Sequence, residues 1–127
     1  SMCGNRFFIC KHCGNLVNMI HSSGAPMVCC GDPMTELEPG SVDASLEKHV
    51  PVVKVEGNTV TVEVGSAIHP MTEEHYIVWI QLQTETGAHR KCLEPGQAPK
   101  AVFSIEGETP ITVFAYCNLH GLWKTDI

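Results

Sequence analysis

Alternation of apolar and polar side chains dominates the chain from residue 52 onward. The segment VVKVEGNTVTVEV (52–64) places two alternating Val-rich runs on either side of Gly57-Asn58, a pair that favours a tight turn. Three further runs rich in β-branched and aromatic residues have the length of strands, namely HYIVWIQLQT (75–84), KAVFSIEG (100–107) and PITVFAYC (110–117). Because turn-forming stretches with Gly and Pro separate these runs, the pattern predicts a mainly β fold, built as an antiparallel sandwich.

The first part of the chain lacks this alternation. It holds two short cysteine motifs, CKHCGN (10–15) and CCGDPM (29–34), with little helical periodicity between them. The stretch EPGSVDAS (38–45) has the Pro, Gly, Ser and Asp content of a linker. We therefore predict two domains, a small four-cysteine module over residues 1–38 and a β-sandwich over residues 39–127.

Composition narrows the possible partners and the cellular compartment. The 127-residue chain carries a formal net charge of −6 and only eight Lys and Arg residues, which argues against nucleic acid as a partner. It has no apolar stretch near the ~18 residues that cross a bilayer and no leader-like start, so we expect no membrane contact and a cytoplasmic location. Seven cysteines, an odd number, and seven histidines favour metal or redox chemistry over a disulfide framework.

Four cysteines in the two short motifs have the spacing of a metal site: Cys10, Cys13, Cys29 and Cys30. Gly14 and Gly31 follow the two pairs, where a positive φ is needed to close a tight turn. Adjacent side chains of a strand point to opposite faces, so Cys29 and Cys30 share one ion only if the backbone turns sharply between them. A structural zinc knuckle and a disulfide pair are the alternatives, and thiolate ligation alone does not separate iron from zinc.

A second group of metal-binding side chains lies at predicted strand ends and in loops: His49, His69, His75, Cys117 and His120. Cys117 shares strand parity with Val113 and Ala115 on an apolar face, so its sulfur should point inward. Any one of these histidines alone would ordinarily be a surface residue or a hydrogen-bonded core residue. Their joint pattern, with Cys117 and His120 three residues apart, indicates a metal site completed by earlier parts of the chain.

Five motifs, in order and spacing, resemble those of the desulfoferrodoxin family, the two-iron class of superoxide reductase: CKHCGN, VCCGDPM, EKHVPV, HPMTEEHYIVWI and CNLHGLWK. The resemblance implies a desulforedoxin-like N-terminal module whose rubredoxin-type iron is held by Cys10, Cys13, Cys29 and Cys30. It also implies an immunoglobulin-like sandwich whose iron has one axial and four equatorial ligands, Cys117 with His49, His69, His75 and His120. No motif assigns a role to Cys3, Cys92 or His89.

The resemblance further implies the reaction and its participants. Superoxide would be reduced by one electron to hydrogen peroxide at the histidine site, with the four-cysteine iron as an accessory electron-transfer centre and a rubredoxin-like protein as electron donor. Lys48 would attract superoxide and support protonation, and Glu47 would cap the open position of the oxidised iron. A homodimer is expected. The alternatives are a non-catalytic electron-transfer or metal-storage protein, and a zinc knuckle fused to a sandwich-type binding module.

Overall fold

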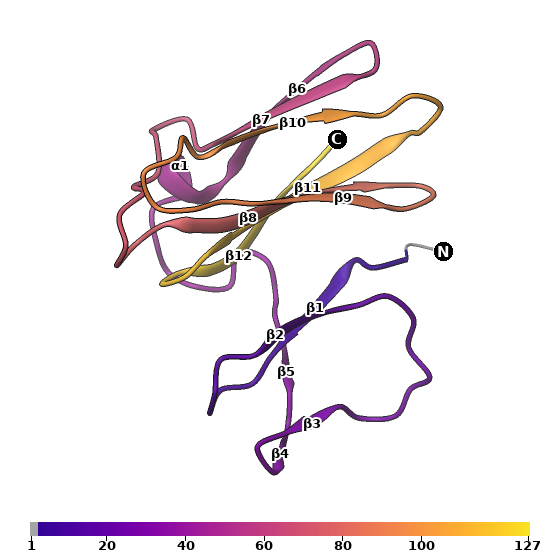
Figure 1. Ribbon diagram of the computed structural model, residues 1–127, viewed down its shortest axis with the longest axis vertical. Coiled ribbons are helices and arrows are strands. Elements are labelled where there is room, and N and C mark those ends of the chain that lie inside the picture. Colours follow the sequence, from indigo (N-terminus) through magenta and orange to yellow (C-terminus); the bar gives the residue numbers. More distant parts are fainter. Residues whose placement is uncertain (1–2) are drawn as a thin grey trace.

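The computed structural model describes residues 3–127, and the chain there forms twelve strands and one short helix (Figure 1). Five short strands make up the N-terminal module: β1 (Arg6–Ile9), β2 (Leu16–Met19), β3 (Val28–Cys29), β4 (Asp32–Pro33) and β5 (Thr35–Glu36). The rest of the chain contains α1 (Leu46–His49), β6 (Pro51–Glu56), β7 (Thr59–Val64), β8 (Ile77–Thr84), β9 (Ala88–Cys92), β10 (Lys100–Ser104), β11 (Pro110–Cys117) and β12 (Gly121–Asp126).

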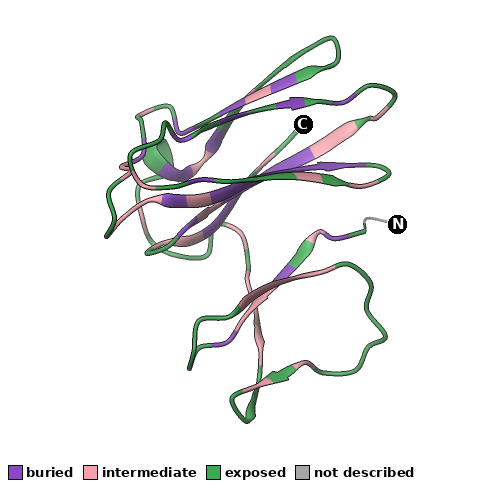
Figure 2. Cartoon of the chain, viewed as in Figure 1, coloured by how far each residue is buried: buried purple, intermediate pink, exposed green. Residues whose placement is uncertain are grey.

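Two antiparallel sheets, in the orders β10-β7-β6 and β12-β11-β8-β9, form the predicted immunoglobulin-like sandwich. Their facing side chains make one apolar core, which Figure 2 shows as burial concentrated on the inner strands. The predicted hairpin is confirmed, because β6 and β7 pair from Pro51↔Val64 to Glu56↔Thr59 around Gly57-Asn58. Alternate residues of β7, among them Val60 and Val62, are fully buried in this core.

The other predicted strands are confirmed, β11 with the predicted ends and β8 and β10 with shifted ends, whereas two further strands of the sandwich were not expected. β8 begins at Ile77 rather than at His75, and β10 ends at Ser104. The charged segment of β9 and the strand β12 after His120 do not have the β-branched pattern that marks an isolated strand. Each forms because it pairs with a buried neighbour, β9 with β8 and β12 with β11.

The N-terminal module consists of the sheet β2-β1-β5 and the small hairpin β3-β4. It lies beside the four-stranded sheet of the sandwich (Figure 1). Phe7 is its main buried anchor, and its ring stacks on Trp79 with a centroid distance of 4.9 Å and meets Phe114 edge-on at 5.1 Å. The buried amide of Gln83 donates to the carbonyl oxygen of Cys3 at 2.9 Å, which ties Cys3 to β8.

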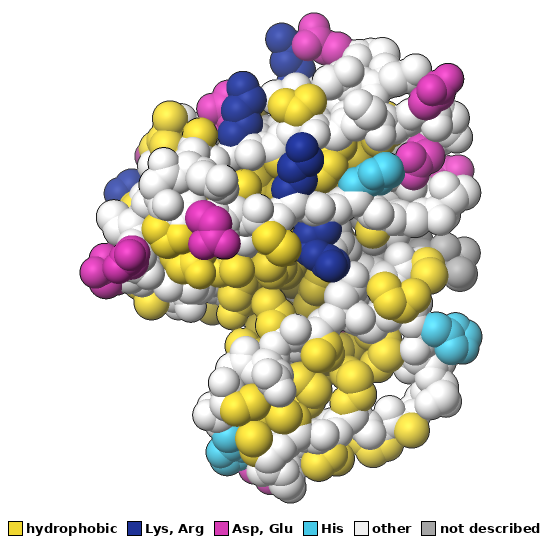
Figure 3. Space-filling model, viewed as in Figure 1, with side chains coloured by type: hydrophobic (Ala, Val, Ile, Leu, Met, Phe, Trp, Pro, Cys, Tyr) yellow, Lys and Arg dark blue, Asp and Glu magenta, His cyan; other side chains and the backbone are white. Residues whose placement is uncertain are grey.

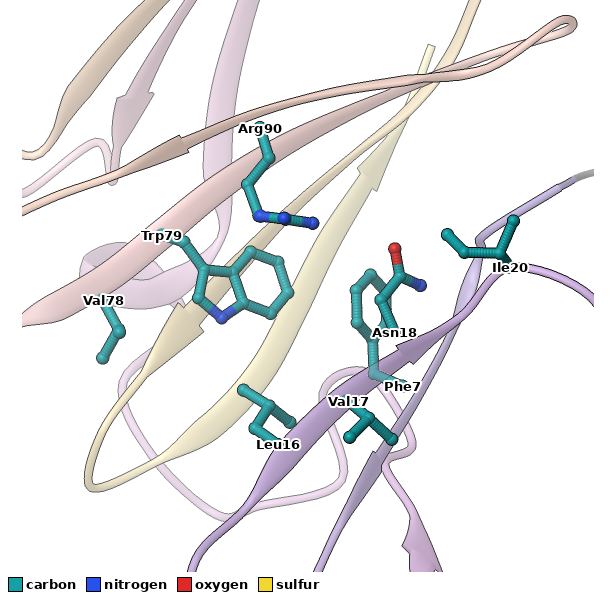
Figure 4. Close-up of a pocket in the computed structure, with 8 residues that line it drawn as sticks. All are labelled: Phe7, Leu16, Val17, Asn18, Ile20, Val78, Trp79 and Arg90. Carbon is teal, nitrogen blue, oxygen red and sulfur yellow. The ribbon is translucent and has the colours of Figure 1, made fainter. Parts of the chain in front are cut away.

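A groove of about 580 Å³ follows this junction between the two parts of the chain. Figure 4 shows Trp79 and Arg90 of the sandwich facing side chains that β1 and β2 contribute, among them Phe7, Leu16 and Asn18. None of the candidate metal ligands lines the groove. Within residues 3–127, α1 has only four residues, and no helix there has the length and apolar character of a membrane span.

Candidate metal centres

The five side chains of the second predicted group meet at one end of the sandwich. His49 ends α1, His69 follows β7, His75 precedes β8, Cys117 ends β11, and His120 lies in the turn before β12. The ligand atoms of His49, His69, His75 and Cys117 all lie within 4.8 Å of one another. His120 joins them, because its Nδ1 lies 3.1 Å from Nε2 of His49 and 3.9 Å from Sγ of Cys117.

Hydrogen bonds fix which ring nitrogen of two histidines carries the proton. Nδ1 of His49 donates to the carbonyl oxygen of Ser45 at 2.6 Å, and Nδ1 of His69 donates to that of Pro70 at 2.7 Å. A carbonyl oxygen only accepts, so the lone pair of each ring is on Nε2, which faces the cluster. Sequence reasoning missed Ser45 and Pro70, because a backbone acceptor leaves no signal in residue type.

Two Nε2 atoms of the cluster have no hydrogen-bond partner in the described part of the chain. The Nε2 atoms of His69 and His75 are buried and unpaired, although leaving a buried polar atom without a partner costs roughly 1–3 kcal/mol. A metal ion coordinated by these lone pairs removes that cost. The cluster therefore has the donor atoms, tautomers and burial of a metal centre.

Burial favours the neutral form of three imidazoles in the cluster, those of His49, His69 and His75. Loss of solvent lowers the pKa of His69 to about 4, and it also lowers the pKa values of His49 and His75. The positive charge of the neighbouring Lys48 is a smaller cause of the lower pKa values of His49 and His75. Neutral imidazole is the form that binds metal, so the site is prepared for an ion at neutral pH.

Cys117 supplies the sulfur of this cluster from the sandwich core. It is fully buried with Val113 and Ala115 on the inner face of β11, as the strand parity predicted. Burial raises the pKa of its thiol, whereas the backbone N–H groups of Leu119 and His120 lower it. A coordinated metal ion removes the thiol proton, and these two N–H groups then stabilise the thiolate. Four imidazoles and one thiolate suit iron well.

Asn118 connects this sulfur to the segment that carries His75. Its Oδ1 accepts from the Tyr76 N–H at 2.9 Å, its Nδ2 donates to the Glu74 carbonyl at 2.9 Å, and its own N–H donates to the Tyr76 carbonyl at 3.2 Å. The pairing of β11 with β8 shifts register at this point. The amide therefore continues the strand contacts past an irregularity and holds both neighbours of His75.

The four cysteines of the N-terminal motifs also converge, with their sulfur atoms all within 4.8 Å of one another. Sγ of Cys29 lies 3.6 Å from that of Cys13 and 4.0 Å from that of Cys30. About 3.8 Å is expected between ligands of a tetrahedron with metal–sulfur bonds of about 2.3 Å. The required sharp turn is present, because Cys30 has a left-handed φ of 53°.

Glycine closes each cysteine turn. Gly14 and Gly31 have φ values of 84° and 80°, as the sequence predicted, and a Cβ at either position would make this backbone conformation strained. His12 and Asp32 then connect the two turns through a side-chain contact. Within residues 3–127 all seven cysteines are free of disulfide bonds, which contradicts the disulfide alternative.

Backbone amides and neighbouring thiols give the cysteine sulfurs unequal acidities. N–H groups, first that of Cys13, lower the pKa of Cys10 to about 6. Hydrogen bonding with the other sulfurs, first that of Cys13, raises the pKa of Cys30 to about 12. Four sulfur anions do not coexist so close together without a cation between them, so the cluster fits a metal ion and not a set of free thiolates.

The other residues named in the sequence analysis lie beside the two clusters or away from them. Glu47 and Lys48 are exposed on α1, directly before His49. Cys3 and Cys92 are exposed single thiols. His89 binds the carboxylate of Glu108 at 2.8 Å, far along β8 and β9 from the histidine cluster. The structure gives Cys3 and Cys92 no metal partner within the described residues.

A four-cysteine cluster on a small β module and a buried histidine–cysteine cluster on a β-sandwich define a two-site metalloprotein. The sequence model of the family described as Desulfoferrodoxin matches residues 41–126, and that of the desulfoferrodoxin N-terminal domain matches residues 3–37. The chain belongs to the desulfoferrodoxin family.

Similar proteins match over nearly the whole chain. A desulfoferrodoxin homolog of Archaeoglobus fulgidus is 47% identical over 116 residues, covering 91% of this chain and 92% of the relative. The desulfoferrodoxin of Nitratidesulfovibrio vulgaris is 45% identical over 117 residues and 92% of both chains. The crystal structure of the superoxide reductase from Treponema pallidum is similar with a TM-score of 0.78 and 38% identity, over 94% of this chain and 97% of that chain.

Proposed function

We propose that this protein is a superoxide reductase, which adds one electron and two protons to superoxide to give hydrogen peroxide. The observation that carries the proposal is the cluster of four imidazoles and one thiol, in which the Nε2 atoms of His69 and His75 are buried and lack a hydrogen-bond partner among the described residues. The superoxide reductase from Treponema pallidum shares the fold over 94% of this chain.

The proposed ligands of the catalytic iron are His49, His69, His75, His120 and Cys117. An iron ion bound by four imidazoles and one thiolate supplies an electron that the thiolate makes easier to donate, and a position where a small anion binds. The protein's own contribution is to favour the neutral form of three of these imidazoles by burial and to hold the sulfur with two backbone N–H groups. Ile77, Ala115 and the other core residues around Cys117 exclude water from the sulfur side.

We assign the approach of superoxide to the α1 segment. Lys48 would attract the anion and hold a proton for the product, and Glu47 would cap the position that a bound iron leaves open. Support comes from the effect of Lys48 on the pKa values of His49 and His75, and from two hydrogen bonds that fix the Glu47 carbonyl. Ala67 N–H and Ser66 Oγ donate these bonds at 2.9 and 3.3 Å.

The four-cysteine cluster is proposed to bind the second iron as an accessory electron-transfer centre in a domain of residues 1–38, with residues 39–127 as the catalytic domain. We propose a rubredoxin-like protein as the electron donor, a cytoplasmic location, and a homodimer formed through the small domain. Apolar side chains over this part of the surface support the dimer (Figure 3). Ile20 is 62% exposed and Val28 is 61% exposed in this module, so a second copy packed there would remove apolar surface from water.

The decisive experiment is rapid mixing of the reduced, iron-loaded protein with pulsed superoxide, followed by assay of peroxide and dioxygen. A reductase yields one peroxide for each superoxide and no dioxygen, whereas a dismutase yields both products in equal amounts. Metal analysis of the same sample should find two iron atoms per chain. Zinc in the four-cysteine cluster with no metal in the histidine cluster, or release of dioxygen, would contradict the proposal.

Cys117→Ser tests the ligand assignment separately from the reaction. A hydroxyl is a harder and weaker donor than a thiolate, so the variant should lose the thiolate-to-iron charge-transfer absorption. Superoxide reduction should fall at least tenfold even where iron is retained. An unchanged absorption band would show that Cys117 is not an iron ligand, whatever the reaction catalysed.

A further inference from the structure

One buried aromatic side chain contacts two of the five proposed iron ligands. Trp123 lies in β12 and is 2% exposed. Its ring stacks on that of His49, with a centroid distance of 5.0 Å and an interplanar angle of 30°. Its Nε1–H donates to the backbone carbonyl of His120 at 3.1 Å. The two contacts use different parts of one rigid indole group.

These contacts join ligands that come from distant parts of the chain. His49 and His120 are 71 residues apart in sequence, yet Nε2 of His49 lies 3.1 Å from Nδ1 of His120. The hydrogen bond to Ser45 fixes one edge of the His49 ring, and the indole packs against its face. The bond from Trp123 to the His120 carbonyl restrains the turn from which the His120 side chain leaves the backbone.

Strand pairing explains why this position suits the task. Trp123 pairs with Ala115 of β11, and Leu122 pairs with Tyr116, so β12 runs alongside the strand that ends at Cys117. Cross-strand partners lie on the same face of a sheet, so Trp123 stands beside the small side chain of Ala115. Since an indole has only two side-chain torsions and Trp123 is 2% exposed, the ring keeps its position at little entropic cost.

We propose that Trp123 is a positioning residue, which holds His49 and His120 in the arrangement that binds iron. The inference rests on the ligand assignment of the proposed function. The indole N–H is a donor only, so Trp123 acts through the two histidines and not as a ligand itself. Loss of a group that orients metal ligands typically weakens metal binding by about 10- to 100-fold.

Two variants separate the two contacts. Trp123→Phe keeps an aromatic ring against His49 but removes the hydrogen bond to His120, whereas Trp123→Leu removes both. In the iron-loaded full-length protein, we expect Trp123→Phe to release iron from the histidine site to a chelator about tenfold faster than the parent, and Trp123→Leu about 100-fold faster. Both should shift or broaden the thiolate-to-iron charge-transfer band.

The other tryptophan of the chain provides a matched control. Trp79 stacks against Phe7 and Tyr116 at the junction with the N-terminal module. Trp79→Phe makes the same chemical change away from His49 and His120, so it should release iron at the parental rate and leave the band in place. Where Trp123→Leu does not fold, the comparison of Trp123→Phe with Trp79→Phe decides the question.

Equal release rates for these two Phe variants, with a parental charge-transfer band in Trp123→Phe, would overturn the inference. Release and absorption are measured before superoxide is added, so they do not depend on turnover. An iron-loaded parent that makes no peroxide would therefore overturn the proposed reaction while leaving the role of Trp123 intact. A parent whose histidine cluster takes up no iron would overturn both.

Discussion

Gly65 approaches the backbone of α1 so closely that a Cβ at this position would lie 2.5 Å from the carbonyl oxygen of Glu47. The same Cβ would lie 3.0 Å from backbone atoms of Lys48 and Val50. Because these atoms are backbone, Gly65→Ala can be accommodated only by moving the segment that carries His49. We expect a loss of about 1–3 kcal/mol in the free energy of unfolding and lower iron content in the histidine site.

Gly87→Ala is the matched control for this prediction. A Cβ at Gly87 would meet no atom within 4 Å, and its backbone is not left-handed. Iron analysis and denaturant unfolding of the two variants should therefore differ, while the colour of the four-cysteine site stays the same in both. If Gly65→Ala keeps the parental iron content, the prediction is wrong, because α1 can then move without affecting the iron ligands.

The sequence predicted the sandwich because its strands follow simple alternation. The hairpin β6–β7 is the clearest case, since its two Val-rich runs and the Gly57-Asn58 turn are local signals. β9 was missed because its charged segment Ala88–Cys92 pairs with β8 but faces solvent at most positions. β11 is buried on both faces, because Phe114 packs toward Phe7 while Val113 and Ala115 face the core. The alternation of apolar and polar residues along β11 does not reveal that the N-terminal module covers its outer face.

The metal ligands could also be predicted from the sequence, whereas the groups that orient them could not. Metal-binding residue types at motif spacing can be read directly, and the structure brings all nine together in two clusters. The groups that orient these ligands are the backbone carbonyl of Ser45, the indole of Trp123, and Gly65, where the backbone of α1 leaves no space for a side chain. Their roles depend on three-dimensional packing, and residue type alone does not distinguish them from ordinary core or turn residues.

Cys30→Ser tests whether the two metal centres are independent. Cys30 occupies the left-handed position of its turn and belongs only to the four-cysteine cluster. We expect loss of the colour of that site, together with superoxide reduction near the parental rate when a chemical reductant is supplied. Absorption spectra and rapid mixing measure the two effects. A correctly folded variant that no longer reduces superoxide would show that the catalytic site depends on the first centre.

Glu108→Gln tests an acid-sensitive contact of the sandwich. Its carboxylate accepts hydrogen bonds from His89 at 2.8 Å and from Thr84 at 2.9 Å, which lower the pKa of Glu108 below its usual 4.5. A carboxyl group with a lowered folded-state pKa stabilises the fold above pH 4.5, and this contribution disappears as the pH falls through the folded-state value. The variant should therefore be less stable than the parent at neutral pH, with a difference that shrinks below pH 4.5.

Urea unfolding at a series of pH values measures this difference. Glu106→Gln serves as the control, because Glu106 is exposed and makes no side-chain hydrogen bond within the described residues. Its stability should follow that of the parent at every pH. A constant difference between Glu108→Gln and the parent down to pH 3 would assign the effect to packing and not to the charge of the carboxylate.

Lys48 provides the sharpest test of how superoxide reaches the site. The protein has a formal net charge of −6, so its overall field repels an anion unless a nearby cation reverses the field at the opening. Lys48 is exposed beside His49, and its charge lowers the pKa values of His49 and His75. Lys48→Met should slow the bimolecular step with superoxide by about tenfold.

Salt dependence separates attraction from other effects of Lys48. Exposed charges are screened beyond a Debye length of about 8–10 Å at physiological salt, so the parent rate should fall as salt rises and the Lys48→Met rate should fall less. Lys54→Met removes the same charge from β6, where Lys54 pairs with Glu56 at 3.5 Å, and should keep the parental rate and slope. Lys48→Arg should restore the attraction but not proton delivery, because a guanidinium stays protonated. If Lys48→Met reacts with superoxide at the parental rate and with the parental salt dependence, Lys48 does not attract the anion, and the attraction comes from the iron centre itself.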